Sequence, residues 1–333
     1  MKNIPFQAFW VTEGPEGVFR SQIVKRSIKV LPQNGVLVKV LYSSLNYKDA
    51  LSATGNKGIT KQYPFTPGID AAGIVTVSNS KQFKEGDVVV VTGYDLGMNT
   101  MGGFAEYINV PAEWLVPLPS GLSAKECMTL GTAGFTAALM LHHLLRCGQL
   151  PDDGPLLVTG ATGGVGSLSV AMASKLGFHV VASTGKKAKE TYLINIGAKE
   201  VLQRSEVDDQ SDRMLLRARW AAAMDTVGGN TLATILKSLK VHGNVACCGN
   251  VASPLLHTSV YPFILNGVNL LGVNTATTPM PLRLNIWDKM ANDWKPDFDL
   301  IETKTVNLQG LKAEIGNILK GEVTGRVVVE MNH

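Results

Sequence analysis

The sequence predicts an α/β protein in which a doubly wound parallel sheet is joined to a small, irregular β-barrel. From about Ser123 onward, strand-like apolar runs are separated by helix-length gaps, a pattern typical of a doubly wound sheet. Before Ser123, short strands follow one another with turn signals and without regular helices between them. We therefore expect a first domain over 1–122, completed by 279–333, and a second domain over 123–278.

The composition is that of an ordinary globular protein. Of the 333 residues, 45% are apolar and 17% are charged, and the formal net charge is +4 without a long Lys/Arg block. Nucleic acid is therefore not an expected partner. No apolar segment of signal-peptide length opens the chain, and the apolar run Ala133–Leu141 is too short to span a bilayer. The four cysteines form no C-x-x-C pair, so we expect reduced thiols, a cytoplasmic protein and no membrane partner.

Four strands are predicted in the first domain. Turn-forming stretches such as Pro64–Gly68 and Met101–Gly103 separate them. The expected strands are Gly35–Leu45, Gly73–Val77, Gly86–Val91 and Phe104–Val110. A closing strand is expected near the end of the chain, at Arg326–Glu330. It resembles the strands of the first domain more than those of the second, so the chain is expected to return to complete the barrel.

The second domain opens with helices. Ser123 and Glu126 form a capping box, Ser followed by Glu three residues later, and a second helical pattern runs from Gly131 to Leu145. Six strands then alternate with helix-length segments. They are Leu156–Val158, Phe178–Thr184, Ala198–Leu202, Trp220–Val227, Gly243–Gly249 and Asn269–Asn274.

A glycine-rich turn is the main functional signal. The apolar run Leu156–Val158 enters Gly160-x-x-Gly163-x-x-Gly166, and a helical pattern opens at Ser167. Glycines let backbone N–H groups approach phosphates closely, and the start of a helix favours negative charge. We expect this turn to bind a dinucleotide pyrophosphate, although any tight turn between strand and helix can carry such glycines. The expected contacts are Thr162, Gly163, Gly164 and Val165.

The end of the next strand indicates which dinucleotide binds. NAD-binding folds usually place an acid there for the ribose 2′-hydroxyl, about 20 residues after the glycines. Here the residues are Thr184, Gly185, Lys186 and Lys187. The lysines are compatible with a solvated helix start, but cations oppose the dipole of a helix's first turn, so a bound 2′-phosphate explains them better. We predict NADPH as the cofactor.

Further cofactor contacts follow from position. Ligands of doubly wound sheets bind beyond the carboxyl ends of the strands. Arg204, Asn250 and Thr275 follow the third, fifth and sixth predicted strands. Thr132 begins a helix and is expected near the same cleft.

These segments together resemble the medium-chain dehydrogenase/reductase superfamily, and within it the zinc-free, quinone-oxidoreductase-like YhdH/YhfP group with its acrylyl-CoA reductases of the AcuI type. Nearly the whole chain carries the likeness. The matching segments are Ser44–Asp49, Pro67–Gly73, Gly131–Ala137, Thr159–Gly166, Asp225–Gly229, Pro262–Leu265 and Gly325–Arg326. The resemblance implies a GroES-like barrel joined to a Rossmann domain, NADPH as cofactor and a homodimer. Lys186, where some members have arginine, and Asn250, where an apolar residue is common, depart from the pattern.

The resemblance also implies catalytic residues. It places the loop with Asn46 and Tyr47 over the nicotinamide. Asn46 would hold the nicotinamide ribose or the substrate carbonyl, and Tyr47 would cover the ring or give a proton to the α-carbon. Simple packing of Tyr47 is an equal alternative, because a phenol with a reference pKa of about 10 is a reluctant acid. Ile264 and Arg326 are cofactor contacts by resemblance alone, and Asp49 and Asp70 are expected to fix loops.

The absence of metal ligands favours one reaction class. Zinc alcohol dehydrogenases share this architecture but need cysteine and histidine ligands, and residues 1–122 contain neither. We therefore expect no metal site, and reduction of an activated carbon–carbon double bond, in which an enolate needs only hydrogen-bond donors. The expected substrate is a small molecule of the acrylyl-CoA or enoyl-thioester type. NADPH:quinone or small-enone reduction is the first alternative, and a non-catalytic NADPH-binding protein is the second.

Overall fold

The computed structural model describes residues 3–33 and 35–332, which form two compact units. Unit 1 comprises Met1–Thr132, Ala276–Ala291 and Glu302–His333, and unit 2 comprises Ala133–Thr275 and Asn292–Ile301. The division differs in detail from the expected 122/123 and 278/279 boundaries. Helix α2 (Ala124–Arg146) begins in unit 1 and is broken at Gly131, where φ is 51°. The break in the helix therefore marks the change of unit.

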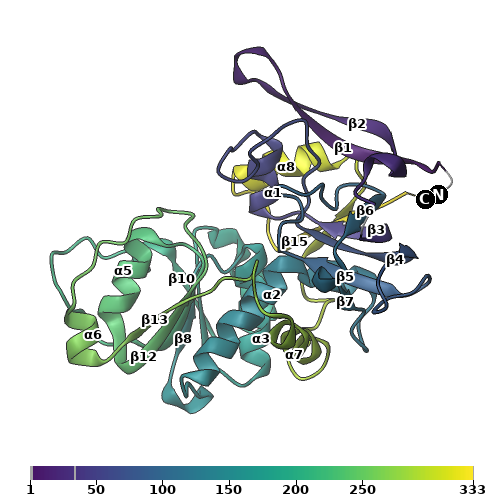
Figure 1. The fold of residues 1–333 in the computed structure, drawn as a ribbon. Coiled ribbons are helices and arrows are strands. Elements are labelled where there is room, and N and C mark those ends of the chain that lie inside the picture. The colour runs from purple at the N-terminus through teal and green to yellow at the C-terminus, as the bar shows by residue number, and fades with distance from the viewer. Residues whose placement is uncertain (1–2, 34, 333) are drawn as a thin grey trace. The chain divides into compact units, whose positions relative to one another are not determined.

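Unit 2 contains the predicted doubly wound sheet. Its six strands are β8 (Leu156–Val158), β9 (Val180–Thr184), β10 (Glu200–Gln203), β11 (Trp220–Asp225), β12 (Leu239–Cys247) and β13 (Asn269–Gly272). They pair in parallel in the order β10-β9-β8-β11-β12-β13, so the strand order reverses between β8 and β11. This is the order of a Rossmann sheet, and the fold prediction is confirmed. Figure 1 labels β8, β10, β12 and β13 of this sheet. All six residues of β11 are buried, as expected for a central strand covered on both faces.

The helices of unit 2 connect these strands. They are α3 (Gly164–Lys175), α4 (Glu190–Asn195), α5 (Gly229–Ser238) and α6 (Tyr261–Asn266). Helix α3 begins at Gly164 and not at Ser167 as predicted, because Gly163 already occupies the position before its first turn. Strand β12 begins four residues before the predicted Gly243, and its pairing with β11 is irregular between Trp220 and Ala222.

Unit 1 is built on a seven-stranded sheet. Its strands are β3 (Val36–Ser44), β4 (Asp70–Ser78), β5 (Val88–Thr92), β6 (Tyr107–Val110), β7 (Val116–Pro117), β14 (Thr303–Val306) and β15 (Arg326–Glu330). The order is β14-β15-β3-β4-β5-β7, with β6 also paired to β3. The predicted closing strand is β15, and Val328 pairs antiparallel with Ser44 of β3.

Several elements of unit 1 differ from the expectation. The predicted strand Phe104–Val110 is reduced to β6, because Phe104 and Ala105 bond instead to Pro67 and to the strand containing Ala8. A separate hairpin joins β1 (Pro5–Glu13) to β2 (Phe19–Ser27). Contrary to the prediction, a helix does occur between the strands. This is α1 (Tyr47–Ala53), and α7 (Met280–Ala291) and α8 (Leu311–Leu319) follow later in the chain.

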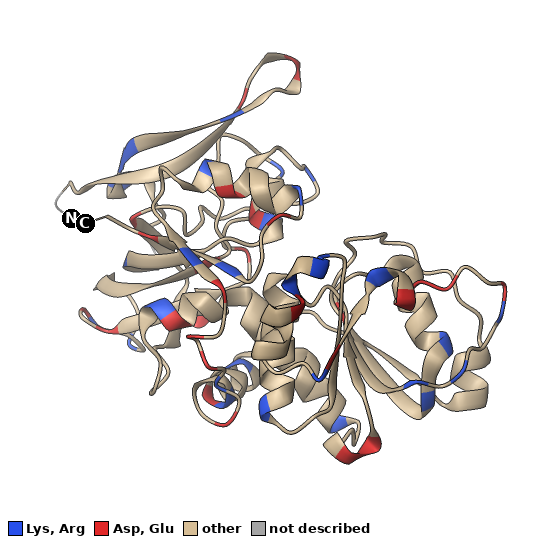
Figure 2. Cartoon of the chain, turned by 180° about the vertical axis from the view of Figure 1, so that it is seen from behind, with Lys and Arg blue, Asp and Glu red and all other residues tan. Residues whose placement is uncertain are grey.

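Helix α2 is also longer than the expected apolar segment. With 23 residues, it is long and apolar enough to cross a membrane by length and composition alone. However, 78% of its most apolar window is buried inside the protein, as in a core helix. Along the ribbon in Figure 2, positions of Lys and Arg are interspersed with positions of Asp and Glu in both units.

Candidate functional site

The glycine turn of unit 2 closes only because its key positions lack side chains. Gly160 has φ 58°, and a Cβ built there would lie 2.3 Å from Thr226 Oγ1. A Cβ on Gly166 would lie 2.2 Å from the carbonyl oxygen of Gly160. Thr226 Oγ1 donates to the carbonyl oxygen of Thr159 at 2.9 Å, which joins the ends of β8 and β11. The turn therefore lies at the point where the strand order reverses.

The first turn of α3 presents its backbone donors at this point. The N–H groups of Gly164, Val165 and Gly166 have no carbonyl one turn earlier to bond, and the preceding residue, Gly163, has no side chain to cap them. The buried Thr162 lies beside them, with its hydroxyl oxygen 3.2 Å from that of Thr184 at the end of β9. The combination of free donors and the positive end of the helix dipole forms an anion site.

Two cationic side chains lie at the end of β9 and β10. The Lys186 backbone N–H donates to Thr184 Oγ1 at 3.0 Å. A Cβ on Gly185 would lie 2.7 Å from Arg204 Nη2, so the guanidinium of Arg204 rests against the Gly185 backbone. Within the described chain, the exposed Arg204 side chain makes no hydrogen bond or ion pair. This edge therefore offers an uncommitted guanidinium to an anion.

A buried carboxylate fixes the loop after β11. Asp225 accepts from Thr159 Oγ1 at 2.6 Å and from the N–H of Gly228 at 2.8 Å. Burial raises the pKa of this carboxyl, and these hydrogen bonds oppose the rise. Burial and the neighbouring Asp225 raise the pKa of the Cys247 thiol to about 11, so Cys247 stays protonated and is not a nucleophile at neutral pH.

The remaining predicted contacts of unit 2 are not all brought together. Asn250 follows β12 and its Cα lies 3.2 Å from a Cβ built on Gly228, so it lies beside the loop after β11. Thr275 follows β13 at the same carboxyl edge of the sheet. Ile264 does not join them. Ile264 lies on α6 and is 67% exposed. Gly267, which directly follows α6, lies beside His242 in the first half of β12, whereas Asn250 follows the carboxyl end of that strand.

Unit 1 contains a buried polar cluster centred on Asp70. Asp70 Oδ2 accepts from Ser44 Oγ at 2.6 Å, from Asn46 Nδ2 at 2.8 Å and from the N–H of Thr132 at 2.9 Å. Asp70 Oδ1 accepts from Thr132 Oγ1 at 2.5 Å. Asp70 is fully buried, so these four donors take the place of water around its carboxylate.

Asp49 is a second carboxylate in the cluster. It accepts from the N–H of Asn46 and from the N–H of Ile69, each at 2.8 Å, and thereby ties the start of α1 to the segment before β4. Burial, followed by repulsion from Asp70, raises the pKa of Asp49 to about 7, although its hydrogen bonds act in the opposite direction. Both aspartates hold loops in place, as predicted, and they do so within one shared network.

Arg326 supplies the positive charge of the cluster. Its Nε donates to the carbonyl oxygen of Thr129 at 2.9 Å, and its Nη1 lies 3.3 Å from Asn46 Oδ1. Its Nη2 is buried without a hydrogen-bond partner among the described residues. A Cβ on Gly131 would lie 3.0 Å from this Nη2 and 2.6 Å from Asp70 Oδ2. Burial lowers the pKa of Arg326 and the charge of Asp70 opposes this, but a guanidinium remains charged.

Asn46 and Tyr47 differ sharply in accessibility. Asn46 is 9% exposed, and its amide donates to Asp70 and Asp49 and accepts from Arg326, so its polar atoms are committed within the cluster. Tyr47, the first residue of α1, is 45% exposed. Unit 1 thus brings together Asn46, Thr132 and Arg326 among the predicted residues. Sequence reasoning missed that Ser44, Asp49, Asp70 and Gly131 complete the same cluster.

Metal ligands do not gather in the part of the chain that the structure describes. Within residues 3–33 and 35–332, no group of three or more His, Cys, Asp or Glu side chains could hold a metal ion.

Two family models match the chain. Residues 32–120 match the alcohol dehydrogenase GroES-like domain, and residues 164–292 match the zinc-binding dehydrogenase domain. Acrylyl-CoA reductase AcuI of Ruegeria pomeroyi is 40% identical over 98% of this chain and 99% of the relative. YhfP of Bacillus subtilis, named as a quinone oxidoreductase, is 46% identical over 92% of this chain and 93% of the relative.

Solved structures agree with these matches. The structure of Escherichia coli YhdH with bound NADPH has a TM-score of 0.94 and 40% identity, and covers 98% of this chain and 100% of that one. The structure of YhfP with NAD bound has a TM-score of 0.95 and 43% identity, and covers 98% and 99%.

Proposed function

This chain belongs to the medium-chain dehydrogenase/reductase superfamily, in the group of YhdH, YhfP and AcuI, and on that premise we propose that it reduces an activated carbon–carbon double bond with NADPH. The observation that supports NADPH most directly is the edge formed by Gly185 and Arg204. An exposed guanidinium without a partner in the described chain rests there, on a glycine, where NAD-binding folds place an acid.

The residues of unit 2 fit this cofactor. Open N–H groups at the start of α3 suit the pyrophosphate, and a Cβ on Gly163 would lie only 3.3 Å from the carbonyl oxygen of Gly160. Lys186 and Arg204 suit the 2′-phosphate, Thr162 and Thr184 border it, and Asn250 and Thr275 extend the site along the carboxyl edge of the sheet. Ile264 remains a prediction by resemblance only.

The cluster of unit 1 suits the chemical step. NADPH, when bound, supplies the hydride that adds to the β-carbon of the substrate. The protein must then stabilise negative charge on the substrate's carbonyl oxygen, and hydrogen-bond donors held in a fixed geometry do this. We assign donation to the exposed Tyr47 and positioning to Asn46, whose polar atoms are already engaged with Asp70, Asp49 and Arg326. Arg326 holds Asn46 and the Thr129 carbonyl within the cluster, and Thr132 orients the Asp70 carboxylate.

The substrate we favour is an enoyl thioester of the acrylyl-CoA type. Similarity to AcuI over almost the full length of both chains supports this choice. Reduction of quinones or small enones is the alternative, supported by similarity to YhfP. A non-catalytic NADPH-binding protein is the third candidate, because the features of unit 2 alone satisfy it.

A substrate panel separates these candidates. NADPH oxidation would be followed with acrylyl-CoA, crotonyl-CoA, a quinone and a simple enone, with Tyr47→Phe as the matched variant. We expect turnover of acrylyl-CoA at a higher kcat/KM than any quinone. Faster turnover of the quinone would favour the alternative, and NADPH binding without turnover of any substrate would favour the binding protein.

Three further expectations belong to this proposal. Activity is independent of zinc, so elemental analysis should find less than about 0.1 zinc per chain and a chelator should leave turnover unchanged.

The protein is expected to be a cytoplasmic homodimer. Its four free cysteines suit a reducing compartment. Strand β13 pairs only with β12 in its sheet, and exposed apolar residues are frequent in the segment from the end of β12 through β13, which supports an interface at this edge. These residues are Val251, Leu255, Val260, Ile264, Leu265 and Leu270.

A further inference from the structure

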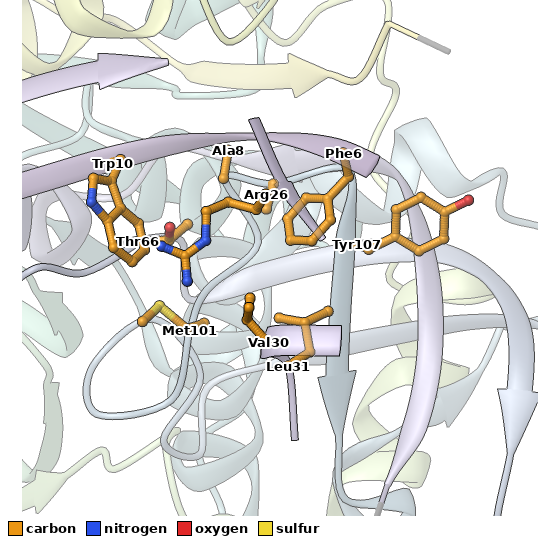
Figure 3. Close-up of a pocket in the computed structure, with 10 residues that line it drawn as sticks. Phe6, Ala8, Trp10, Arg26, Val30, Leu31, Thr66, Met101 and Tyr107 are labelled. Carbon is orange, nitrogen blue, oxygen red and sulfur yellow. The ribbon is translucent and has the colours of Figure 1, made fainter. Parts of the chain in front are cut away.

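A small cavity in unit 1 lies between the β1–β2 hairpin and the segments around Thr66 and Met101 (Figure 3). Its volume is about 30 Å³. Most of its wall is apolar, and two polar groups face it, the guanidinium of Arg26 and the hydroxyl of Thr66. The lining residues are Phe6, Ala8, Trp10, Arg26, Val30, Leu31, Thr66, Met101, Ala105 and Tyr107.

The Arg26 guanidinium is held in place but keeps its donors free. Its central carbon lies 4.0 Å from the centroid of the Trp10 ring, a stacked arrangement. In Figure 3 the side chain extends past Trp10 toward Met101 and Thr66. Within the residues that the structure describes, it makes no hydrogen bond or ion pair. A guanidinium stacked on a ring can still direct its N–H edge at an anion, so the donors of Arg26 are available to bind one.

Thr66 provides a second, independent indication of a ligand. The residue is 2% exposed, and its hydroxyl has no hydrogen-bond partner in the described ranges. This hydroxyl is not one of the fully buried polar atoms without a partner, so it is open to the cavity that Thr66 lines. A ligand or water there can form a hydrogen bond with it.

The wall of the cavity is rigid. Gly102 N–H donates to the carbonyl oxygen of Thr66 at 2.8 Å, and Gly103 N–H donates to that of Gly68 at 2.7 Å. The segments that carry Thr66 and Met101 are therefore fixed to each other without a ligand. On the other wall, Ala8 and Val24 are paired in the β1–β2 ladder that carries Trp10 and Arg26.

The geometry points to a binding site for a short-chain aliphatic carboxylate in this cavity. One water-sized group needs about 10–15 Å³ of such volume, so 30 Å³ accommodates a carboxylate head of two or three atoms. The guanidinium edge of Arg26 matches the two oxygens of a planar carboxylate, and the Thr66 hydroxyl can donate to one of them. The head fills this volume, so a short alkyl tail would extend from the open side of the cavity, beside the exposed Val30. This site is separate from the proposed cofactor and catalytic residues and does not depend on the proposed function.

The probe for this site is propionate, with propionamide as the neutral molecule of the same shape. The protein would be labelled with ¹⁵N-tryptophan, and the Trp10 indole signal would be assigned with Trp10→Phe. At constant ionic strength, propionate should shift this signal with a dissociation constant in the millimolar range, and propionamide should not. Crystals soaked in 3-bromopropionate should show bromine anomalous density in the cavity.

Variants test the two polar groups. Arg26→Gln should weaken propionate binding at least tenfold, and Thr66→Val should weaken it severalfold. Arg20→Gln removes an exposed arginine from the same strand, β2, outside the cavity, and should bind like the wild type. An equal response to propionamide, unchanged binding by Arg26→Gln, or a stronger response to inorganic phosphate than to propionate would overturn the proposal. Because Arg26 is partly exposed, its variant should fold even if Thr66→Val does not.

Discussion

Thr132 donates both its backbone N–H and its hydroxyl to the carboxylate of Asp70, at 2.9 Å and 2.5 Å. The two residues are 62 positions apart, and the contact joins the first residue of β4 to α2 one residue after its break at Gly131. Arg326 and Asp70 both lie against Gly131. The break in α2, the buried carboxylate and the buried guanidinium are therefore parts of one arrangement.

Replacing Asp70 tests how much this arrangement contributes to the free energy of unfolding. Asp70→Asn should lower the free energy of unfolding by about 3–5 kcal/mol, because it removes a buried charge near Arg326 and turns an acceptor toward Ser44, Asn46 and Thr132 into an amide. Urea unfolding measures the loss. Glu85→Gln, on an exposed side chain of the same unit, should stay within about 0.5 kcal/mol of the wild type. A loss below about 1 kcal/mol for Asp70→Asn would contradict the expectation.

Comparing Gly131→Ala with Gly148→Ala distinguishes the cost of backbone strain from the cost of steric overlap. Gly131→Ala places a Cβ 2.5 Å from Ser44 Oγ at a φ of 51°, whereas Gly148→Ala has a φ of 82° with nothing within 4 Å. Gly131 combines its φ with a ψ of −155°, a conformation that residues other than glycine rarely adopt, so Gly131→Ala should lose about 1–3 kcal/mol from backbone strain and about 1–3 kcal/mol more from overpacking. Gly148→Ala should lose only the backbone strain of its positive φ, about 1–2 kcal/mol. Thermal unfolding of the two variants compares them directly, and equal losses would exclude the steric effect.

Arg204 should determine the choice between NADPH and NADH. Arg204→Gln removes a charge-assisted contact to the 2′-phosphate and should cost about 1.5–3 kcal/mol, or roughly ten- to a hundredfold in NADPH affinity, with NADH binding nearly unchanged. Lys186→Ala should act in the same direction. Isothermal titration with both cofactors is the measurement, and Arg213→Gln, on another exposed arginine of unit 2, is the control. Equal losses for NADPH and NADH would remove these residues from the 2′-phosphate site.

Asp49 should make stability depend on pH. Its pKa is raised from 3.8 to about 7 in the folded protein, so the proton is bound more tightly in the folded than in the unfolded state. Its contribution to stability is fully present below about pH 4, falls between about pH 4 and pH 7, and is constant above that range. The total change is on the order of 4 kcal/mol.

Asp49→Asn removes this titration. The difference in unfolding temperature between the wild type and Asp49→Asn should change in favour of the variant as pH rises from 4 to 7, and then stay constant. The carboxyl-carbon NMR signal of Asp49, identified by its loss in the variant, gives the pKa itself. A midpoint near 4 would show that the hydrogen bonds from Asn46 and Ile69 outweigh burial.

Local signals account for what the sequence predicted well. Ser123 and Glu126 do form the capping box, with the Ser123 N–H donating to Glu126 Oε2 at 2.7 Å and the Glu126 N–H to Ser123 Oγ at 3.2 Å. The glycine turn and the strands of unit 2 were predicted because each lies within a short window, where periodicity and turn residues act directly.

The cluster around Asp70 could not be predicted in the same way. Its partners come from Ser44, Thr132 and Arg326, and no local pattern reports which distant segments a sheet brings together. The β1–β2 hairpin was missed for a different reason. Gly14, Pro15 and Gly17 do mark its turn, but β2 is mostly polar and no residue of it is fully buried, so it lacks the apolar pattern that predicts a strand.

Variants of Tyr47 test whether its hydroxyl takes part in the reaction or its ring only packs against the cofactor. Its ring is 45% exposed at the start of α1, and the buried Asn46 fixes the backbone beside it. If the phenol hydroxyl donates to the developing enolate, Tyr47→Phe should leave NADPH affinity intact and lower hydride transfer to an enoyl thioester by roughly a hundred- to a thousandfold, equivalent to about 2.7–4 kcal/mol. If Tyr47 only packs, Tyr47→Phe should be nearly silent, whereas Tyr47→Ala should weaken NADPH binding. Cofactor dissociation constants and single-turnover rates for both variants decide between these roles. A wild-type rate in Tyr47→Phe would remove Tyr47 from the catalytic residues.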